Sequence, residues 1–168
     1  METDKIYNKY YDEVVLLLET GLRISEFCGL TTHIDMQNRI LNIDHQLLKD
    51  SEMGYYIETP KTKNGKRELP LTERAYQAIQ RILKNRRKAQ PLIVGGYSNF
   101  LFLNREGLPK VAGNYEGMVR GLIKKYNKYH TDKLPNITPH SFRHTYCTNM
   151  ANRGMNQTLC NISWDTLT

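Results

Sequence analysis

Two sets of residues in the sequence have the types and spacing that suit phosphate binding. Arg23 and Glu26 are three residues apart, so a helix places the carboxylate beside the guanidinium and lets it fix the orientation of that group. His140, Arg143 and His144 are spaced i, i+3, i+4 and therefore share one face of a helix. The two arginines stay charged and present paired donors to phosphate oxygens.

The second set falls at a predicted helix N-terminus. Thr138 and Pro139 are typical of a helix start, because threonine caps the first turn and proline fits the first helical position. Unpaired N–H groups and the helix dipole favour anions there, so a phosphate cradle would include His140 and Arg143. Taken separately, the Arg23–Glu26 pair is equally compatible with a surface ion pair. For His140 alone, a structural role is favoured over a catalytic one.

A third concentration of positive charge falls on a predicted β-hairpin. Asn64-Gly65 is a strong turn signal, because both residues tolerate positive φ. It separates β-like runs at residues 55–59 and 67–71. The hairpin carries three lysines: Lys61, Lys63 and Lys66.

The hydrophobic periodicity predicts the elements that must position these groups. Helices are expected at residues 5–19, 23–30, 72–88, 111–128 and 138–152. Gly21 is the expected break between the first two helices. A further strand is expected at residues 39–43, and residues 100–103 form a strand or a buried link. The predicted fold is α+β, mainly α, with one small antiparallel sheet or hairpin.

The charge distribution narrows the class of partner. The 168 residues carry a net charge of +7, and the excess lies in residues 55–134, with 17 lysines and arginines against 6 acidic residues. Residues 1–54 carry 5 against 10. This asymmetry favours a face that meets a polyanion, although a basic total alone is also typical of a solvated surface.

Composition excludes several other classes. No stretch approaches the ~18 apolar residues of a membrane span, and the polar N-terminus does not resemble a signal peptide, so a cytoplasmic protein is expected. Three cysteines without C-x-x-C spacing favour neither a disulfide framework nor a zinc site. Neither a membrane nor a metal is therefore predicted as a partner.

Three motifs, in their order and spacing, resemble the tyrosine recombinase (phage integrase) family, most closely the integrases of conjugative transposons. They are TGLRISE at 20–26, PKTKNGKR at 60–67 and TPHSFRHT at 138–145. The resemblance covers nearly the whole chain. It implies the helical catalytic domain of that family, incomplete and spanning residues 1–155, with double-stranded DNA as its partner.

The resemblance also implies roles for the arginines and the histidines. Arg23 and Arg143 would grip the non-bridging oxygens of the scissile phosphate. Glu26 would orient Arg23 without touching DNA. His140 would assist proton transfer or phosphate binding, and His144 would contact DNA.

For the hairpin, the resemblance implies a general acid. Lys61 would protonate the leaving 5′ oxygen, with Lys63 as the alternative because the turn register is open. Other contacts with DNA are expected from Lys63, Lys66 and Arg67. No metal or cofactor is implied, because the cations take over charge stabilisation. Bound to DNA, the protein would be associated with the nucleoid.

The sequence departs from the family at the nucleophile, which is a tyrosine downstream of a second Gly-His pair. Neither element is present: 25 residues follow Arg143, and the last tyrosine, Tyr146, is interpreted as a core residue. No nucleophile is therefore assigned, and the fragment is predicted to bind DNA without cleaving it alone. A third hypothesis is that another protomer supplies the tyrosine in trans. The alternative function is a non-catalytic DNA-binding module or a competitor at recombination sites.

Residues 156–168 do not resemble the family and are predicted to be an out-of-frame or truncated tail. With permissible codons, restoring one C before codon 157 reads Pro-Asn-Thr-Leu-Gln-Tyr-Ile-Met-Gly-His-Ser-Asp in the other frame. This favours a one-base deletion, with a natural truncation or a chosen end point as the rival explanation. The tail is expected to be poorly ordered. The resemblance also implies terminal helices that this sequence lacks, and their absence is expected to expose apolar surface that promotes self-association.

Overall fold

The structure, a computed structural model, describes residues 4–60 and 66–154. The predictions for Lys61, Lys63 and the tail at 156–168 therefore lie outside the described residues. Within the described ranges the fold is α+β and mainly α, as predicted.

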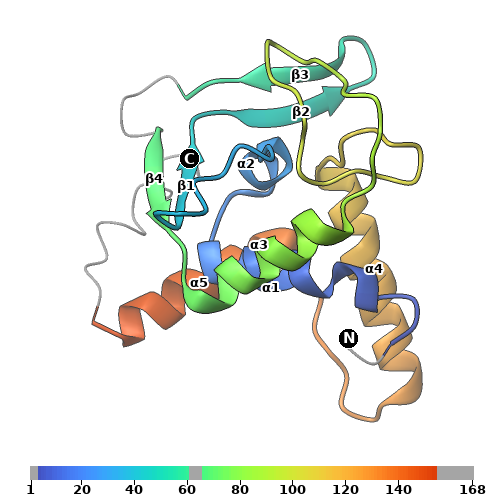
Figure 1. The fold of residues 1–168 in the computed structure, drawn as a ribbon. Helices are drawn as coiled ribbons and strands as arrows, with labels where there is room; N and C mark the ends of the chain where they lie inside the picture. The colour runs from blue at the N-terminus through green and yellow to red at the C-terminus, as the bar shows by residue number, and fades with distance from the viewer. Residues whose placement is uncertain (1–3, 61–65, 155–168) are drawn as a thin grey trace.

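Helices form most of the regular structure. Their bounds are η1 (a 3₁₀ turn, Asn8–Tyr10), α1 (Tyr11–Thr20), α2 (Ile24–Gly29), α3 (Glu73–Asn85), α4 (Ala112–Tyr129) and α5 (Pro139–Asn152). Helix α1 packs against both α3 and α5, while α2 lies beside the strands (Figure 1). None of the helices in the described ranges is long and apolar enough to cross a membrane.

The strands form two separate antiparallel pairs. Their bounds are β1 (Ile40–Ile43), β2 (Gln46–Asp50), β3 (Gly54–Glu58) and β4 (Arg67–Pro70). β1 pairs with β4, from Ile40 opposite Pro70 to Ile43 opposite Arg67. β2 pairs with β3, from Gln46 opposite Glu58. The predicted pairing between the runs at 55–59 and 67–71 is wrong in the described residues, because each run pairs with an earlier strand instead.

The strand β2 was not predicted from the sequence. Its only buried side chain is Leu47, so the alternation that marks a half-buried strand is weak. A tight turn creates the pairing: the Asp50 carboxylate accepts hydrogen bonds from the backbone N–H of Glu52 (2.8 Å) and Met53 (2.6 Å). Gly54 completes it with a φ of +71°, a conformation that favours glycine.

The first helix begins later than predicted. The Asp4 carboxylate accepts the backbone N–H of Ile6 (2.8 Å) and Tyr7 (3.1 Å), and this turn leads into η1 instead of a regular helix from residue 5. Ile6, near the start of the helix predicted at residues 5–19, is correspondingly 58% exposed. The fully buried side chains of α1 include Leu16 and Leu17.

Aromatic side chains from distant parts of the chain form the centre of the core. Phe27 of α2 stacks on Phe102 with ring centroids 4.3 Å apart, and Tyr115 of α4 meets Phe27 edge-on. The segment 100–103 is therefore mainly a buried link, held by isolated bridges at Phe100 and Leu103. This packing fixes α2 against α4 and so sets the position of the residues at the start of α2.

Candidate active site

The turn between α1 and α2 places Arg23 at the centre of the candidate site. Gly21 ends α1 in the left-handed conformation (φ +60°), with its N–H donating to the Leu17 carbonyl at 3.0 Å. The chain can then reverse direction, and Arg23 becomes the residue that precedes α2. Its backbone N–H donates to Glu26 Oε2 at 3.0 Å, which closes the first turn of α2. The predicted break at Gly21 is confirmed.

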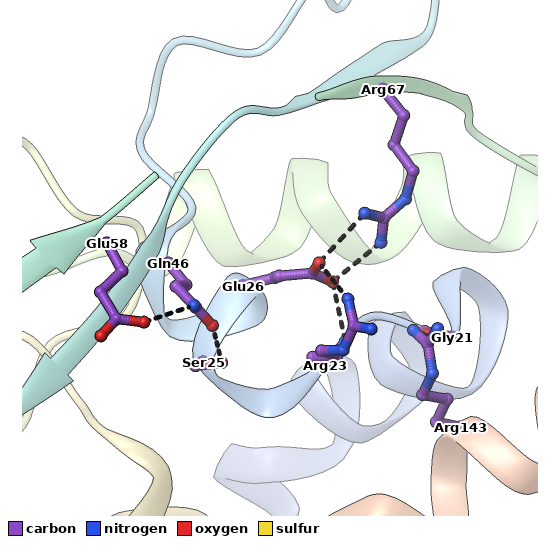
Figure 2. Close-up of polar contacts among 8 residues, drawn as sticks. All are labelled: Gly21, Arg23, Ser25, Glu26, Gln46, Glu58, Arg67 and Arg143. Atoms are coloured by element: carbon purple, nitrogen blue, oxygen red, sulfur yellow. Dashed lines mark hydrogen bonds and ion pairs between the residues drawn. The ribbon is translucent and has the colours of Figure 1, made fainter. Parts of the chain in front are cut away.

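The Glu26 carboxylate is shared by two arginines. Arg67, the first residue of β4, donates to it twice, from Nη1 to Oε1 at 3.0 Å and from Nη2 to Oε2 at 2.8 Å. Arg23 Nη1 reaches Oε1 at 3.3 Å. Figure 2 shows the two guanidinium groups meeting the carboxylate from different elements. The predicted Arg23–Glu26 pair is therefore present, as part of a larger charged cluster.

Charge in this cluster is stabilised despite burial. Burial has the largest single effect on the Glu26 carboxyl and favours its neutral form, but the hydrogen bonds and positive charges of Arg67 and Arg23 together outweigh it. The pKa of Glu26 consequently lies below its ordinary value. Glu26 is an anion at neutral pH and needs its cationic partners in place.

Arg143 enters the site from α5, 120 residues along the chain from Arg23. Its Nη1 donates to the Gly21 carbonyl at 2.5 Å (Figure 2). The side chain is buried, and within the described part of the chain its Nε has no hydrogen-bond partner. The pKa of Arg143 is lowered, mainly by burial. The negative charge of Glu26 acts to raise this pKa, and the positive charge of Arg23 acts to lower it. A buried donor without a partner is costly, and an anion would satisfy it.

The two histidines lie at the start of α5 beside Arg143. The rings of His140 and His144 meet edge-on with centroids 4.7 Å apart. Partial burial lowers the pKa of His140, and the positive charges of His144, Arg143 and Arg23 lower it further. The positive charges of both arginines of the candidate site therefore act on His140.

Both ends of the lysine-bearing segment are tied to the first turn of α2. At its end, Arg67 binds Glu26; at its beginning, Glu58 accepts from Gln46 Nε2 (2.9 Å), and Gln46 Oε1 accepts from Ser25 Oγ (2.7 Å). Figure 2 shows these contacts on opposite sides of α2. The last residue of β3 and the first residue of β4 are thus both linked by hydrogen bonds to the first turn of α2.

The structure places the sequence-predicted residues in different surroundings. Arg23 and Glu26 are in contact, Arg143 lies beside them at the Gly21 carbonyl (Figure 2), and His140 precedes Arg143 by three residues in α5. Lys66 is exposed at the start of β4, while Lys61 and Lys63 lie outside the described residues. Tyr146 is half-buried, and its ring packs on Gly21.

Two contributions were missed from the sequence. One is the Gly21 carbonyl, which holds Arg143 and has no side-chain signal. The other is the contact between the Arg67 guanidinium and Glu26; the DNA contact predicted for Arg67 stays a prediction. The motif spacing predicted Arg67 near the site. Its partner Glu26 is 41 residues away in the sequence, and the contact forms only because β4 pairs with β1 in the folded structure.

Comparison with known proteins agrees with this geometry. The model of the phage integrase family matches residues 1–161. The chain belongs to the phage integrase family. Its relatives include the transposase from transposon Tn916 of Enterococcus faecalis, 63% identical over 156 residues, which are 92% of this chain and 38% of that protein. The tyrosine recombinase XerC of Bacillus subtilis is 27% identical over 141 residues. The chain thus spans about two-fifths of the length of these family members.

Solved structures of the same family resemble the fold closely. The Tn1549 transposon integrase in complex with a circular intermediate DNA superposes with a TM-score of 0.89 and 53% identity, covering 92% of this chain and 50% of that one. The XerA recombinase gives a TM-score of 0.62 at 24% identity, covering 90% of this chain and 46% of that one. The predicted resemblance to conjugative-transposon integrases is therefore confirmed at the level of family and fold.

Proposed function

We propose that residues 1–155 are the part of an integrase catalytic domain that binds a phosphate of double-stranded DNA. The observation that carries this is the meeting of Arg23 and Arg143, from elements at opposite ends of the described chain, with a buried Arg143 donor left for an anion. The complex of the Tn1549 integrase with DNA supports the same partner. Two guanidiniums match the two non-bridging oxygens of a phosphodiester.

The other residues have supporting roles in this proposal. Glu26 holds Arg23, and His140 would donate to a phosphate oxygen. Lys61, or Lys63, is the proposed general acid for the 5′ oxygen. Contacts with the neighbouring backbone are assigned to Lys63, Lys66 and His144. The compartment that this function implies is the cytoplasm, at the nucleoid when DNA is bound.

Covalent strand cleavage needs a tyrosine oxygen to attack phosphorus while the bond to the 5′ oxygen breaks. These 168 residues contain no tyrosine after Tyr146, whose ring packs on Gly21. We therefore propose binding without cleavage by this chain alone. That favours the second candidate function, a competitor that occupies recombination sites without chemistry.

A nicked suicide substrate tests the proposal. The expected result is binding to duplex DNA that weakens steeply with salt, with no covalent adduct on a denaturing gel. An adduct would show that a tyrosine is supplied, for instance by another protomer. Absence of binding at low salt would refute the function itself.

Two further expectations have their own tests. The out-of-frame interpretation of residues 156–168 is tested by the nucleotide sequence through that region, where a Gly-His-containing second frame is expected. Self-association is tested by sedimentation at several protein concentrations, with a concentration-dependent mass as the expected result.

A further inference from the structure

Arg67 is turned away from the solvent and towards a buried carboxylate. Its side chain is 26% exposed, against 40% for Arg23 and 7% for Glu26. The paired bonds of Arg67 to Glu26, at 2.8 and 3.0 Å, are the strong bidentate kind. A residue placed mainly to contact DNA would present these donors outward.

The division of the Glu26 oxygens between the two arginines is unequal. A carboxylate offers about four acceptor positions. Arg67 uses one on each oxygen, and the Arg23 backbone N–H takes a third. The Arg23 guanidinium keeps only the longer 3.3 Å contact, so most of its donors are not used by Glu26.

We propose that Arg67 is a positioning residue that saturates Glu26 and thereby leaves Arg23 available for the phosphate. This deepens the proposed function and rests on it. Glu26 is buried and charged, and a buried carboxylate that loses its main partner takes the nearest remaining cation. That cation is Arg23, which would fold onto Glu26 with paired bonds and lose donors for DNA.

Arg67 also adjusts the charge of the site. Three guanidiniums (Arg23, Arg67 and Arg143) and the Glu26 carboxylate give a net formal charge of +2. This exceeds the single negative charge of a phosphodiester and so favours the additional negative charge that develops on its non-bridging oxygens during transfer. Because Arg67 begins β4, it also ties the end of the lysine segment to the helix that carries Arg23.

The first experiment uses the free chain and needs no DNA. Arg67→Gln, Arg67→Lys and the matched control Lys66→Gln are compared by NMR of the Glu26 carboxyl and the Arg23 side chain. In Arg67→Gln we expect a higher pKa for Glu26 and several-fold slower hydrogen exchange at the Arg23 guanidinium. Lys66→Gln, which removes a neighbouring exposed charge, should leave both signals unchanged. Unchanged Arg23 exchange in the folded Arg67→Gln protein would overturn the proposal.

Arg67→Lys covers the case in which Arg67→Gln does not fold. A lysine keeps the charge but cannot form the paired bonds, so Arg23 exchange should slow partially. Arg23 exchange as fast as in the unchanged protein would then count against the proposal.

A double-mutant cycle on DNA separates positioning from direct contact. Arg67→Gln should bind a short duplex about tenfold more weakly. Adding Glu26→Gln, which keeps an acceptor for the Arg23 backbone but removes the charge, should recover most of that loss. An equal loss in both backgrounds would make Arg67 a direct phosphate contact and overturn the proposal. If the unchanged chain binds no DNA, the proposed function fails while the NMR result still decides the role of Arg67.

Discussion

Arg143 shows how one side chain can serve both the fold and the site. Its Nη1 is occupied by the Gly21 carbonyl, and its buried Nε has no partner in the described ranges. A planar group with several donors can hold the backbone on one edge and an anion on another. A lysine at this position could do only one of these.

We therefore expect Arg143→Lys to bind duplex DNA at least about tenfold more weakly, because an ammonium cannot reach the carbonyl and the phosphate together. Fluorescence anisotropy at fixed low salt measures the change. The matched control is Arg153→Lys, at an exposed position just after the same helix, which should bind normally. Equal affinity of the two variants would remove Arg143 from the site.

His140 should make DNA binding depend on pH. Partial burial, first, and neighbouring positive charges disfavour its protonated form in the free protein, whereas a bound phosphate favours it. The pKa is then higher in the complex than in the free chain, so affinity should rise as the pH falls through and below the ordinary histidine value of about 6.5.

The measurement is DNA affinity between neutral and mildly acidic pH. His140→Gln should flatten the profile, while His33→Gln, at an exposed histidine outside the site, should keep it. A profile that keeps its slope in His140→Gln would assign the proton to another group.

At the scale of elements, the α1–α2 turn is the least tolerant part of the site. A Cβ on Gly21 would lie 2.1 Å from Cδ1 of Tyr146, and the positive φ adds backbone strain. Gly21→Ala should therefore lower the free energy of unfolding by roughly 2–4 kcal/mol, combining overpacking with the left-handed conformation. Urea unfolding tests it.

Helix α4 offers the control for that substitution. Gly113 lies in α4, and nothing lies within 4 Å of a Cβ built there. Gly113→Ala should be neutral or stabilise by up to about 1 kcal/mol, through helix propensity alone. Similar losses for both variants would show that the turn carries no special strain.

A buried ion pair joins α1 to the segment before α4. Lys110 Nζ contacts both Glu13 oxygens at 2.7 and 2.9 Å, and the Tyr115 hydroxyl donates to Glu13 at 2.6 Å. Lys110→Met should destabilise the fold by about 3–5 kcal/mol, because it leaves a buried carboxylate without its cation. Thermal or urea unfolding measures this. Lys125→Met, which breaks a half-buried pair with Asp4 near the surface, should change stability much less.

How far the sequence predicts this molecule depends on the range of each interaction. The helix from Pro139 and the break at Gly21 follow from local residue types, and both were predicted. Strand β2 and the strand pairing were not, because they depend on partners elsewhere in the chain. In the site, the motifs located Arg23, Glu26 and Arg143, whereas the Arg67–Glu26 contact needed the three-dimensional arrangement.

For the molecule as a whole, the basic central region predicts a strong electrostatic component in DNA binding. The logarithm of the affinity should fall linearly with the logarithm of the salt concentration. Lys66→Gln should reduce the magnitude of this slope by about 1, the loss of one phosphate contact. The reduction should be similar for DNA of unrelated sequence. An unchanged slope would mean that Lys66 does not touch the backbone.

The bond between Arg143 and the Gly21 carbonyl has a consequence for biosynthesis. It joins two residues that lie 122 positions apart in the chain, so a nascent chain that ends before Arg143 cannot contain it. A polypeptide still on the ribosome, or released before α5 is complete, has Arg23 but lacks the second guanidinium. If the proposed function is right, released products that end before α5 should therefore bind duplex DNA more weakly than a chain that contains α5.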